Sequence, residues 1–332
     1  ARSAGSVCSA GTCLAWRMVE DGALLELQQV ALEKVLEHSV LRIRFPAPLV
    51  GEPCLWEQDK LALVALCSNG TVYVVHLGGG GSGDHDDGDA EMMDESVSSS
   101  VHGPSVLAEV STQSVQHRDL AFELQQATSC AVVGDTLCVG RQNGHIQTVH
   151  LANLDPGAEL KNAIVSRIWT GVTNSIFGHT NTAVVDVACA HLGGRPYLLA
   201  LHADGNLRVW DVANGGTRAL STNLYSLSAA GGSSAAPVDG SLVPFRMCLD
   251  ASASHESRRL ALAVQSFPHG SVAASGSMSV YAIQAGGDEP TSMTVAKGFD
   301  VERVGRILDA TLCAGTVWAI VEVGEFAGGA GG

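Results

Sequence analysis

The chain has 332 residues, of which 46% are hydrophobic and 16% are charged, and its formal net charge is −15. This apolar content excludes a disordered chain, and an acidic chain with only 19 Lys and Arg is a poor non-specific binder of nucleic acid. The longest uninterrupted apolar run, Leu61–Cys67, is far shorter than the roughly 20 residues of a membrane-spanning helix. We therefore expect a folded chain with no direct nucleic-acid partner.

Residues 1–40 read as an N-terminal segment that leads into the main domain. Within this segment, the leucine spacing of Ala23–His38 fits an amphipathic helix. Leu41–Phe45 then alternates apolar and charged residues, which predicts a strand and the start of a domain over 41–325. Residues 326–332 are a Gly-rich end, beyond which we expect a helical domain in a longer protein.

Three segments share one pattern, in which an apolar run, a polar turn ending in Asn-Gly or Asp-Gly, and an alternating run follow each other. The segments are Leu61–Leu77, Thr136–Leu151 and Tyr197–Val212. Both residues of such a turn tolerate a positive φ, so the pattern predicts tight β-hairpins. Leu260–Ile283 and Thr311–Val323 fit the same pattern more loosely.

The turn glycines of the three hairpins are 74 and 61 residues apart, which exceeds the roughly 40–45 residues of a typical propeller blade. Insertions explain the excess. We predict a flexible acidic insertion over 78–104 and a Gly/Ser/Ala loop over 226–240. Repeated strand units without long helices favour an all-β, WD40-like β-propeller with loop insertions over an α/β fold, and a β-sandwich is the alternative.

Two segments resemble ligand sites but lack required residues. Asp84–Glu95 holds seven carboxylates, yet a calcium loop needs a ligand at Gly88 and a glycine at Asp89. Gly78–Gly83 is rich in glycine, but those carboxylates follow it where a phosphate loop needs a lysine and a helix. We therefore predict no cofactor at either segment.

Metal and catalytic sites have no clear pattern. The nine cysteines are odd in number with no Cys-x-x-Cys pair, so we expect free thiols in a reducing compartment, with several buried in apolar runs. Single histidines lie in or near the hairpins, and strand histidines are more often structural than metal ligands. These histidines are His145, His150, His191 and His202. We assign no catalytic residue and predict that the chain is not an enzyme.

The residues Asp204–Asp211 (DGNLRVWD) are similar to the end of a WD-repeat blade. Several further segments, in the same order, resemble the N-terminal β-propeller region of the nucleoporin 160 family. They are Leu41–Pro46, Cys54–Glu57, Leu61–Leu77, Arg167–Gly171, Val185–Trp210, Arg259–Ile283 and Ile307–Ile320. This resemblance covers about Leu41–Val323.

The resemblance implies a seven-bladed propeller that is irregular. The similarity to a WD-repeat blade implies a structural blade motif, in which the Trp packs between sheets and the final Asp closes a turn by hydrogen bonding. Its five residues are Asp204, Gly205, Leu207, Trp210 and Asp211. The resemblance to the nucleoporin 160 family implies a non-enzymatic scaffold of the nuclear pore outer ring, or Y complex, at the nuclear envelope. Its partners would be other Y-complex nucleoporins in a large hetero-oligomer, and its role would be to support mRNA export and protein import.

Three alternatives remain open from the sequence. A generic WD-repeat adaptor would recruit other protein partners, and a propeller enzyme would need converging polar groups. A weak membrane contact is the third, because Ala219–Leu227 spaces Leu220, Leu224 and Leu227 on one face of a helix with few charges. An ordinary surface loop is the plainer interpretation of that stretch. The sequence does not identify the partner-binding surface.

Overall fold

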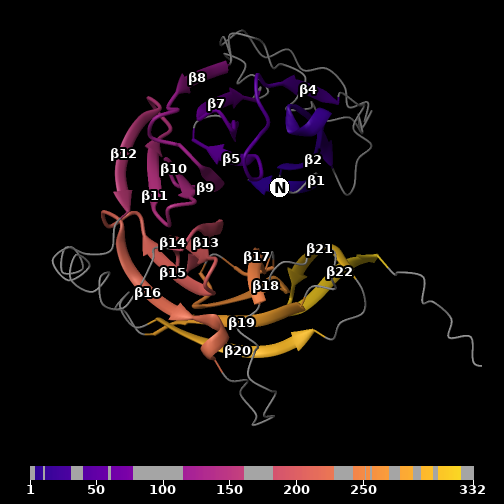
Figure 1. Ribbon diagram of the computed structural model, residues 1–332, viewed down its shortest axis with the longest axis vertical. Coiled ribbons are helices and arrows are strands. Elements are labelled where there is room, and N and C mark those ends of the chain that lie inside the picture. Colours follow the sequence, from indigo (N-terminus) through magenta and orange to yellow (C-terminus); the bar gives the residue numbers. More distant parts are fainter. Residues whose placement is uncertain are drawn as a thin grey trace, which may run out of the picture. The chain divides into compact units, whose positions relative to one another are not determined.

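A computed structural model of the chain describes residues 4–9, 12–30, 40–58, 61–77, 115–160, 182–227, 242–250, 252–254, 256–268, 277–286, 293–301 and 306–322. The prediction of an all-β fold is confirmed, because the elements in these ranges are strands and two short 3₁₀ helices. None of the described helices is long and apolar enough to cross a membrane. The chain divides into two compact units, Ala1–Phe122 and Glu123–Gly332, which are taken in turn (Figure 1).

The first unit contains two four-stranded antiparallel sheets among its described residues, each built from strands consecutive in sequence. The strands of the first sheet are β1 (Ala4–Ser9), β2 (Thr12–Val19), β3 (Leu24–Val30) and β4 (Leu41–Arg44). Those of the second sheet are β5 (Cys54–Glu57), β6 (Leu61–Leu66), β7 (Thr71–His76) and β8 (Val115–Asp119). A 3₁₀ turn, η1 (Glu20–Gly22), connects β2 to β3.

The second unit repeats the same order three times and ends in a hairpin. The strands of its sheets are β9 (Ala127–Val133), β10 (Thr136–Arg141), β11 (Ile146–His150) and β12 (Asp155–Leu160); β13 (Val184–Leu192), β14 (Arg195–His202), β15 (Asn206–Asp211) and β16 (Thr217–Asn223); β17 (Leu242–Leu249), β18 (Arg259–Pro268), β19 (Ser277–Ala285) and β20 (Met293–Val301); and β21 (Arg306–Cys313) with β22 (Thr316–Glu322). A 3₁₀ turn, η3 (Leu224–Ser226), follows β16.

Consecutive sheets pack face to face, because alternate apolar residues of each strand point to opposite faces. In the first unit, Leu14, Leu25 and Leu27 of the first sheet share a core with Leu63 and Val75 of the second. In the second unit, three such cores lie between successive sheets. Within that unit the first strand of each sheet lies on the inside of an arc and the last strand on the outside (Figure 1). Stacking of this kind is the packing of propeller blades.

The predicted hairpins are confirmed, and each Asn-Gly or Asp-Gly turn lies where two paired strands meet. Leu61–Leu77 forms β6 and β7, Thr136–Leu151 forms β10 and β11, and Tyr197–Val212 forms β14 and β15. The two looser hairpins are also formed, as β18 with β19 and β21 with β22. Period-two patterning therefore located five strand pairs correctly.

The helix fitted to Ala23–His38 is wrong over its described part, where Leu24–Val30 is strand β3. This strand pairs with β2 along its whole length and buries Leu25 and Leu27 against the next sheet. Sheet pairing outweighed the weak helical spacing of the leucines. Three strands of the first sheet thus come from the N-terminal segment, so the sheet continues across the boundary placed at residue 40.

Several predictions fall outside the described residues. They are the flexible acidic insertion 78–104, most of the loop 226–240, the Gly-rich end 326–332, and the segment Arg167–Gly171. In the part of the chain that the structure describes, five sheets have four strands and one has two. The seven-bladed architecture stays a prediction.

Candidate functional site

The first part of the predicted blade motif is a tight turn between β14 and β15. Gly205 has a φ of 79° and donates its N–H to the carbonyl oxygen of His202 over 2.9 Å. The carboxylate of Asp204 accepts the backbone N–H of Asn206 at 3.1 Å and the side-chain amide of Asn206 at 2.6 Å. Burial favours the neutral acid, but these hydrogen bonds outweigh it and hold the pKa of Asp204 below its ordinary value.

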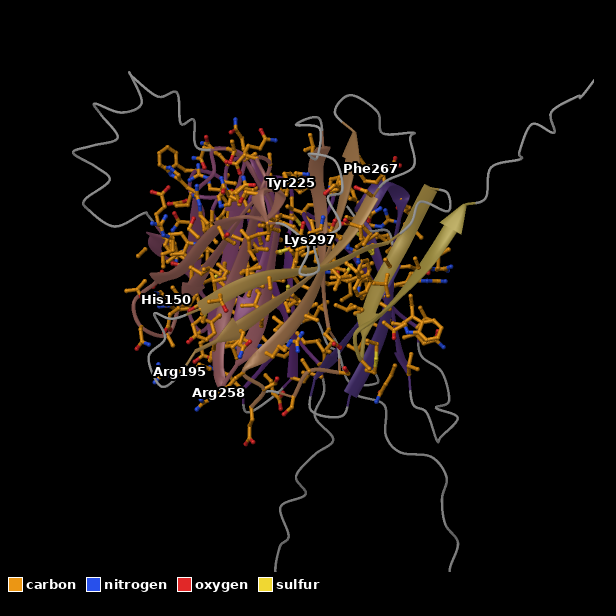
Figure 2. All side chains as sticks on the ribbon, turned by 90° about the horizontal axis from the view of Figure 1, so that it is seen from below. His150, Arg195, Tyr225, Arg258, Phe267 and Lys297 are labelled. Atoms are coloured by element: carbon orange, nitrogen blue, oxygen red, sulfur yellow. The ribbon has the colours of Figure 1, made fainter. Side chains whose placement is uncertain are left out.

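Tyr225 explains why this turn requires glycine. A Cβ at Gly205 would come within 3.0 Å of two ring carbons of Tyr225, closer than side chains approach one another. The tyrosine hydroxyl lies 2.9 Å from the Oγ of Ser266 on β18, and Figure 2 shows Tyr225 and Phe267 at the same end of the second unit, opposite Arg195 and Arg258. Tyr225 therefore links the turn to the following sheet. No sequence pattern indicates Tyr225, since η3 has no repeat signal.

Leu207 and Trp210 point to opposite faces of β15. Leu207 packs with the core shared by sheets β13–β16 and β17–β20. Trp210, 2% exposed, packs with residues of sheet β9–β12 such as Cys138 and Ile146. The structure therefore places the tryptophan between two sheets.

Asp211 lies at the end of β15 and is buried. Its carboxylate accepts the backbone N–H of Asn214 at 3.1 Å and its side-chain amide at 2.6 Å, and its carbonyl accepts the N–H of Gly216 at 3.0 Å. These bonds close the turn between β15 and β16. Each residue of the motif is thus hydrogen-bonded or packed within the fold, and the structural role of the motif stays a prediction.

The four histidines singled out from the sequence do not converge. No group of three or more His, Cys, Asp or Glu side chains suited to a metal occurs among the described residues. His145 contacts the carboxylate of Glu159. His202 is fully buried, and its Nδ1 donates to the carbonyl oxygen of Thr182 at 3.0 Å. Burial, followed by the charge of Arg208, lowers the pKa of His202 to about 4. A neutral structural histidine of this kind gives no periodic signal in the sequence.

The cysteine predictions hold only in part. Seven described cysteines are free, and two of those that lie in apolar runs, Cys67 and Cys138, are buried. Cys313, at the end of β21, is exposed, and Cys13 is disulfide-bonded rather than free. Burial raises the pKa of the Cys67 thiol to about 11, so this cysteine is a poor nucleophile at neutral pH.

The amphipathic helix considered for Ala219–Leu227 is wrong. Its first residues belong to strand β16, and its last residues form and follow the turn η3. Leu224 is buried in the core between two sheets, with Leu220 and Leu227 packed against that core. These leucines are therefore used in folding, and the stretch has no apolar helical face for a lipid surface.

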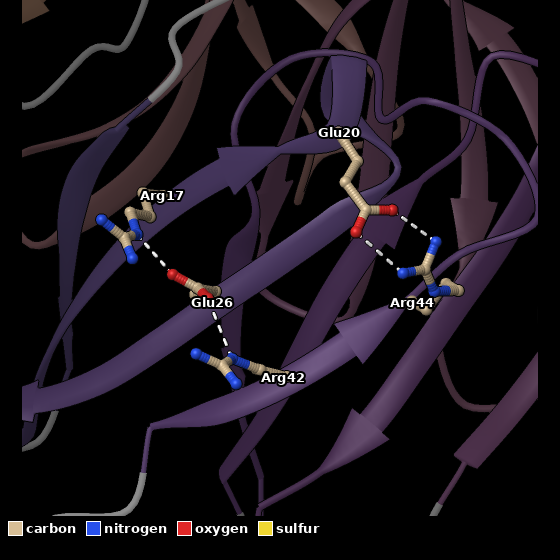
Figure 3. A network of polar contacts seen from close by, with 5 residues as sticks. All are labelled: Arg17, Glu20, Glu26, Arg42 and Arg44. Carbon is tan, nitrogen blue, oxygen red and sulfur yellow. Dashed lines mark hydrogen bonds and ion pairs between the residues drawn. The ribbon is translucent and has the colours of Figure 1, made fainter.

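A network of charged side chains lies on one side of the first sheet, where its arginines are exposed (Figure 3). Glu26 on β3 accepts from the Nε of Arg17 on β2 and from the Nε of Arg42 on β4, the latter at 2.9 Å. The hydrogen bond from Arg17 is the largest cause that holds the pKa of Glu26 below its ordinary value; desolvation opposes it and Arg42 adds to it. Arg44 binds both carboxylate oxygens of Glu20. This network is the densest cluster of ion pairs among the described residues.

The family match agrees with this arrangement of the sheets. The sequence of the chain matches the family described as the nucleoporin Nup120/160 β-propeller domain over residues 12–322. The chain belongs to this family. The prediction of a nucleoporin 160-type β-propeller is confirmed, and the match extends it to residues before Leu41. This chain is thus a Nup120/160 β-propeller domain.

Solved structures similar to this Nup120/160 domain are remote in sequence. One is a chain of the mitotic checkpoint complex, with 13% identity, a TM-score of 0.46, and coverage of 95% of this chain and 73% of that one. Another is the β-propeller domain of Cps50 (Swd1) from Myceliophteria thermophila, with 9% identity, a TM-score of 0.47, and coverage of 92% and 76%.

A third is from the complex of BBS1N with ARL6DN, with 8% identity, a TM-score of 0.44, and 80% of this chain aligned. The chain spans 61% of the length of that protein's chain. No curated protein matches the chain.

Proposed function

We propose that this domain is a structural part of the nuclear pore outer ring, in the Y complex, and that it acts through binding geometry rather than catalysis. The observation that carries the proposal is the family match over residues 12–322. In this role it supports mRNA export and protein import by helping to build the pore. Its partners are other Y-complex nucleoporins, and its location is the nuclear envelope.

The packing of the described sheets supports a mechanical role in an assembly. Each four-stranded sheet of the second unit shares a core with the next, so a force on one sheet passes to its neighbours through packed side chains. The polar residues of the blade motif are engaged in turns, which leaves them unsuited to substrate chemistry. A generic WD-repeat adaptor is the second candidate function, since Asp204–Asp211 is similar to the end of a WD-repeat blade.

The test is affinity purification of the full-length protein from its own cells at moderately raised salt, with mass spectrometry of the bound proteins. Salt weakens exposed electrostatic contacts beyond about 8–10 Å and spares buried interfaces. We expect other outer-ring nucleoporins in near-equal amounts. Recovery of ligase subunits or varied client proteins, with no nucleoporins, would replace the scaffold function with the adaptor function.

A further inference from the structure

Three charged residues form a row across the first sheet. Arg17 of β2 is directly opposite Glu26 of β3, and Glu26 is directly opposite Arg42 of β4. Residues opposite each other in adjacent strands share a face, so the three side chains lie on one side of the sheet (Figure 3). Neighbouring strands are about 4.8 Å apart, so the backbone positions of the two arginines are about 10 Å apart.

Glu26 holds both arginines through the same atom of each guanidinium. Each arginine donates its Nε to one carboxylate oxygen, and the Glu26 side chain is only 9% exposed. The side chains of Arg17 and Arg42 are 64% and 67% exposed, respectively. Within the described ranges, neither arginine has a hydrogen bond through its two terminal nitrogens. Figure 3 draws one contact from each of these guanidinium groups to Glu26, and that contact is made by the Nε atom. Two oriented guanidinium groups therefore face solvent.

Arg44 provides an internal contrast on the same strand as Arg42. Its side chain is equally exposed, at 65%, but both of its terminal nitrogens bind Glu20, the second at 2.8 Å. Arg44 is thus a neutralised arginine, whereas the row of Arg17, Glu26 and Arg42 has a net charge of +1. In a chain of net charge −15, such a positive surface is a local exception.

We propose that the row of Arg17, Glu26 and Arg42 is a docking surface for an acidic segment of a partner protein. The terminal nitrogens of arginine fit a carboxylate in a bidentate geometry, which gives direction as well as attraction. Two such groups, held apart by Glu26, fit two carboxylates of one segment. Nucleic acid is the less suitable polyanion, because its long charged backbone would be repelled by the acidic remainder of the chain.

This inference deepens the proposed function by naming a partner chemistry for the scaffold. It is argued from the geometry of the first sheet, and it is tested on the purified chain without other nucleoporins. Its failure would leave the purification result from cells untouched, and failure of the scaffold function would leave the peptide result untouched.

The experiment measures binding of a fluorescein-labelled hexaglutamate peptide to the purified full chain by fluorescence anisotropy, at low ionic strength. The variants are Arg17→Gln, Arg42→Gln and, as the matched control, Arg44→Gln. We expect each of the first two to weaken binding at least threefold and the control to change it less than 1.5-fold. An equal loss in all three variants would reduce the effect to general charge and overturn the proposal, as would an absence of peptide binding.

Two further measurements separate the geometry of the arginines from their charge, and a protein ligand from nucleic acid. Arg17→Lys and Arg42→Lys keep the positive charge next to Glu26 but remove the planar pair of terminal nitrogens, so they also weaken binding if the geometry matters. Wild-type affinity retained in both lysine variants would contradict the bidentate docking. A duplex DNA oligonucleotide is the second probe. Binding of the duplex as tightly as the peptide, with the same arginine dependence, would assign the surface to nucleic acid instead.

Discussion

The sheet β13–β16 and the hairpin β21–β22 contain the same types of residue, but the tryptophan of the sheet is buried and that of the hairpin is exposed. Both contain a tryptophan and a turn glycine, which is Gly205 in the sheet and Gly315 in the hairpin. The carboxylate of an aspartate accepts backbone N–H groups of each turn. Trp210 is 2% exposed because sheet β9–β12 covers it, whereas Trp318 on β22 is 65% exposed. A hairpin pattern in the sequence thus predicts the strands. Whether a large side chain on such a strand is buried depends on the presence of a neighbouring sheet.

The backbone shows the same contrast. Strand β15 has hydrogen-bonded neighbours on both sides, β14 and β16. Within the described residues, β22 pairs on one side only, with β21. An edge strand with large apolar residues lacks the protection that charged residues or proline give. The stability of β13–β16 is therefore expected to depend on packing, and that of β21–β22 on its turn.

The largest expected effect is that of the paired substitutions Trp210→Ala and Trp318→Ala. Removing the buried indole leaves a cavity between two sheets and lowers the free energy of unfolding by about 3–5 kcal/mol. Removing the exposed indole changes it by about 0.5 kcal/mol or less. Urea denaturation of both variants measures the difference. Equal losses would show that Trp318 is covered in solution and that the comparison fails.

The turn glycines give the second prediction, from Gly205→Ala and Gly315→Ala. Both positions have a positive φ, 79° and 73°, so each alanine carries a backbone strain of about 1 kcal/mol. At Gly205 the new methyl group also meets the ring of Tyr225, while at Gly315 no described atom beyond the adjacent residues lies within 4 Å of the new methyl group. We expect a loss of about 2–4 kcal/mol for Gly205→Ala and about 1 kcal/mol for Gly315→Ala in the same assay.

A Tyr225→Ala background separates the two causes at Gly205. If the collision with the ring is responsible, Gly205→Ala in that background loses only about 1 kcal/mol, like Gly315→Ala. A loss that stays the same without the tyrosine ring would assign the whole effect to the backbone.

The sequence predicted the local structure better than the contacts between sheets. Alternating runs around Asn-Gly and Asp-Gly gave the strands, since the period of two and the turn residues are local properties. The strand at Leu24–Val30 was missed, because its burial depends on a sheet that follows later in the chain. Tyr225 and the row of Arg17, Glu26 and Arg42 were missed for the same reason. Their partners are close in space but distant in sequence, and no spacing rule joins them.

The third prediction concerns the stability of the folded chain between pH 7 and pH 5. The pKa of His202 is about 4 in the folded chain, below its ordinary value of 6.5. Above pH 6.5 the histidine is neutral whether the chain is folded or unfolded. As the pH falls below 6.5 the unfolded chain binds the proton first, so the free energy of unfolding decreases until the folded pKa is reached. Between pH 7 and pH 5 we expect a loss of about 1–2 kcal/mol from this group.

The variant His202→Asn is the control, because an amide can still donate to the carbonyl oxygen of Thr182 and does not titrate. Its stability curve should be flatter than that of the wild type between pH 7 and pH 5. The window ends there because Asp204 and Asp250, whose pKa values are lowered, add their own losses in stronger acid. Parallel curves for the two proteins would show that His202 is not buried as described.

The smallest expected effect belongs to Asp250, which binds the turn of β21–β22. Its carboxylate accepts the N–H groups of Ala314 and Gly315 at 3.1 and 3.2 Å, and it also accepts the N–H of Ser252 at 2.9 Å. In Asp250→Asn an amide group replaces one acceptor oxygen. We expect a loss of about 1 kcal/mol, because one hydrogen bond to a charged group is removed.

Hydrogen exchange locates that loss. In Asp250→Asn the amides of Ala314 and Gly315 should exchange about fivefold faster, since 1 kcal/mol of local stability corresponds to that factor. The amides of β15 should keep their wild-type rates, because that strand is paired on both sides and covered by a further sheet. Glu256→Gln, on an exposed position of the loop that contains Asp250, is the matched control and should change neither set. Faster exchange throughout both regions would mean that the hairpin β21–β22 and the sheet β13–β16 open as one unit, and that the edge strand β22 is no less stable than the central strand β15.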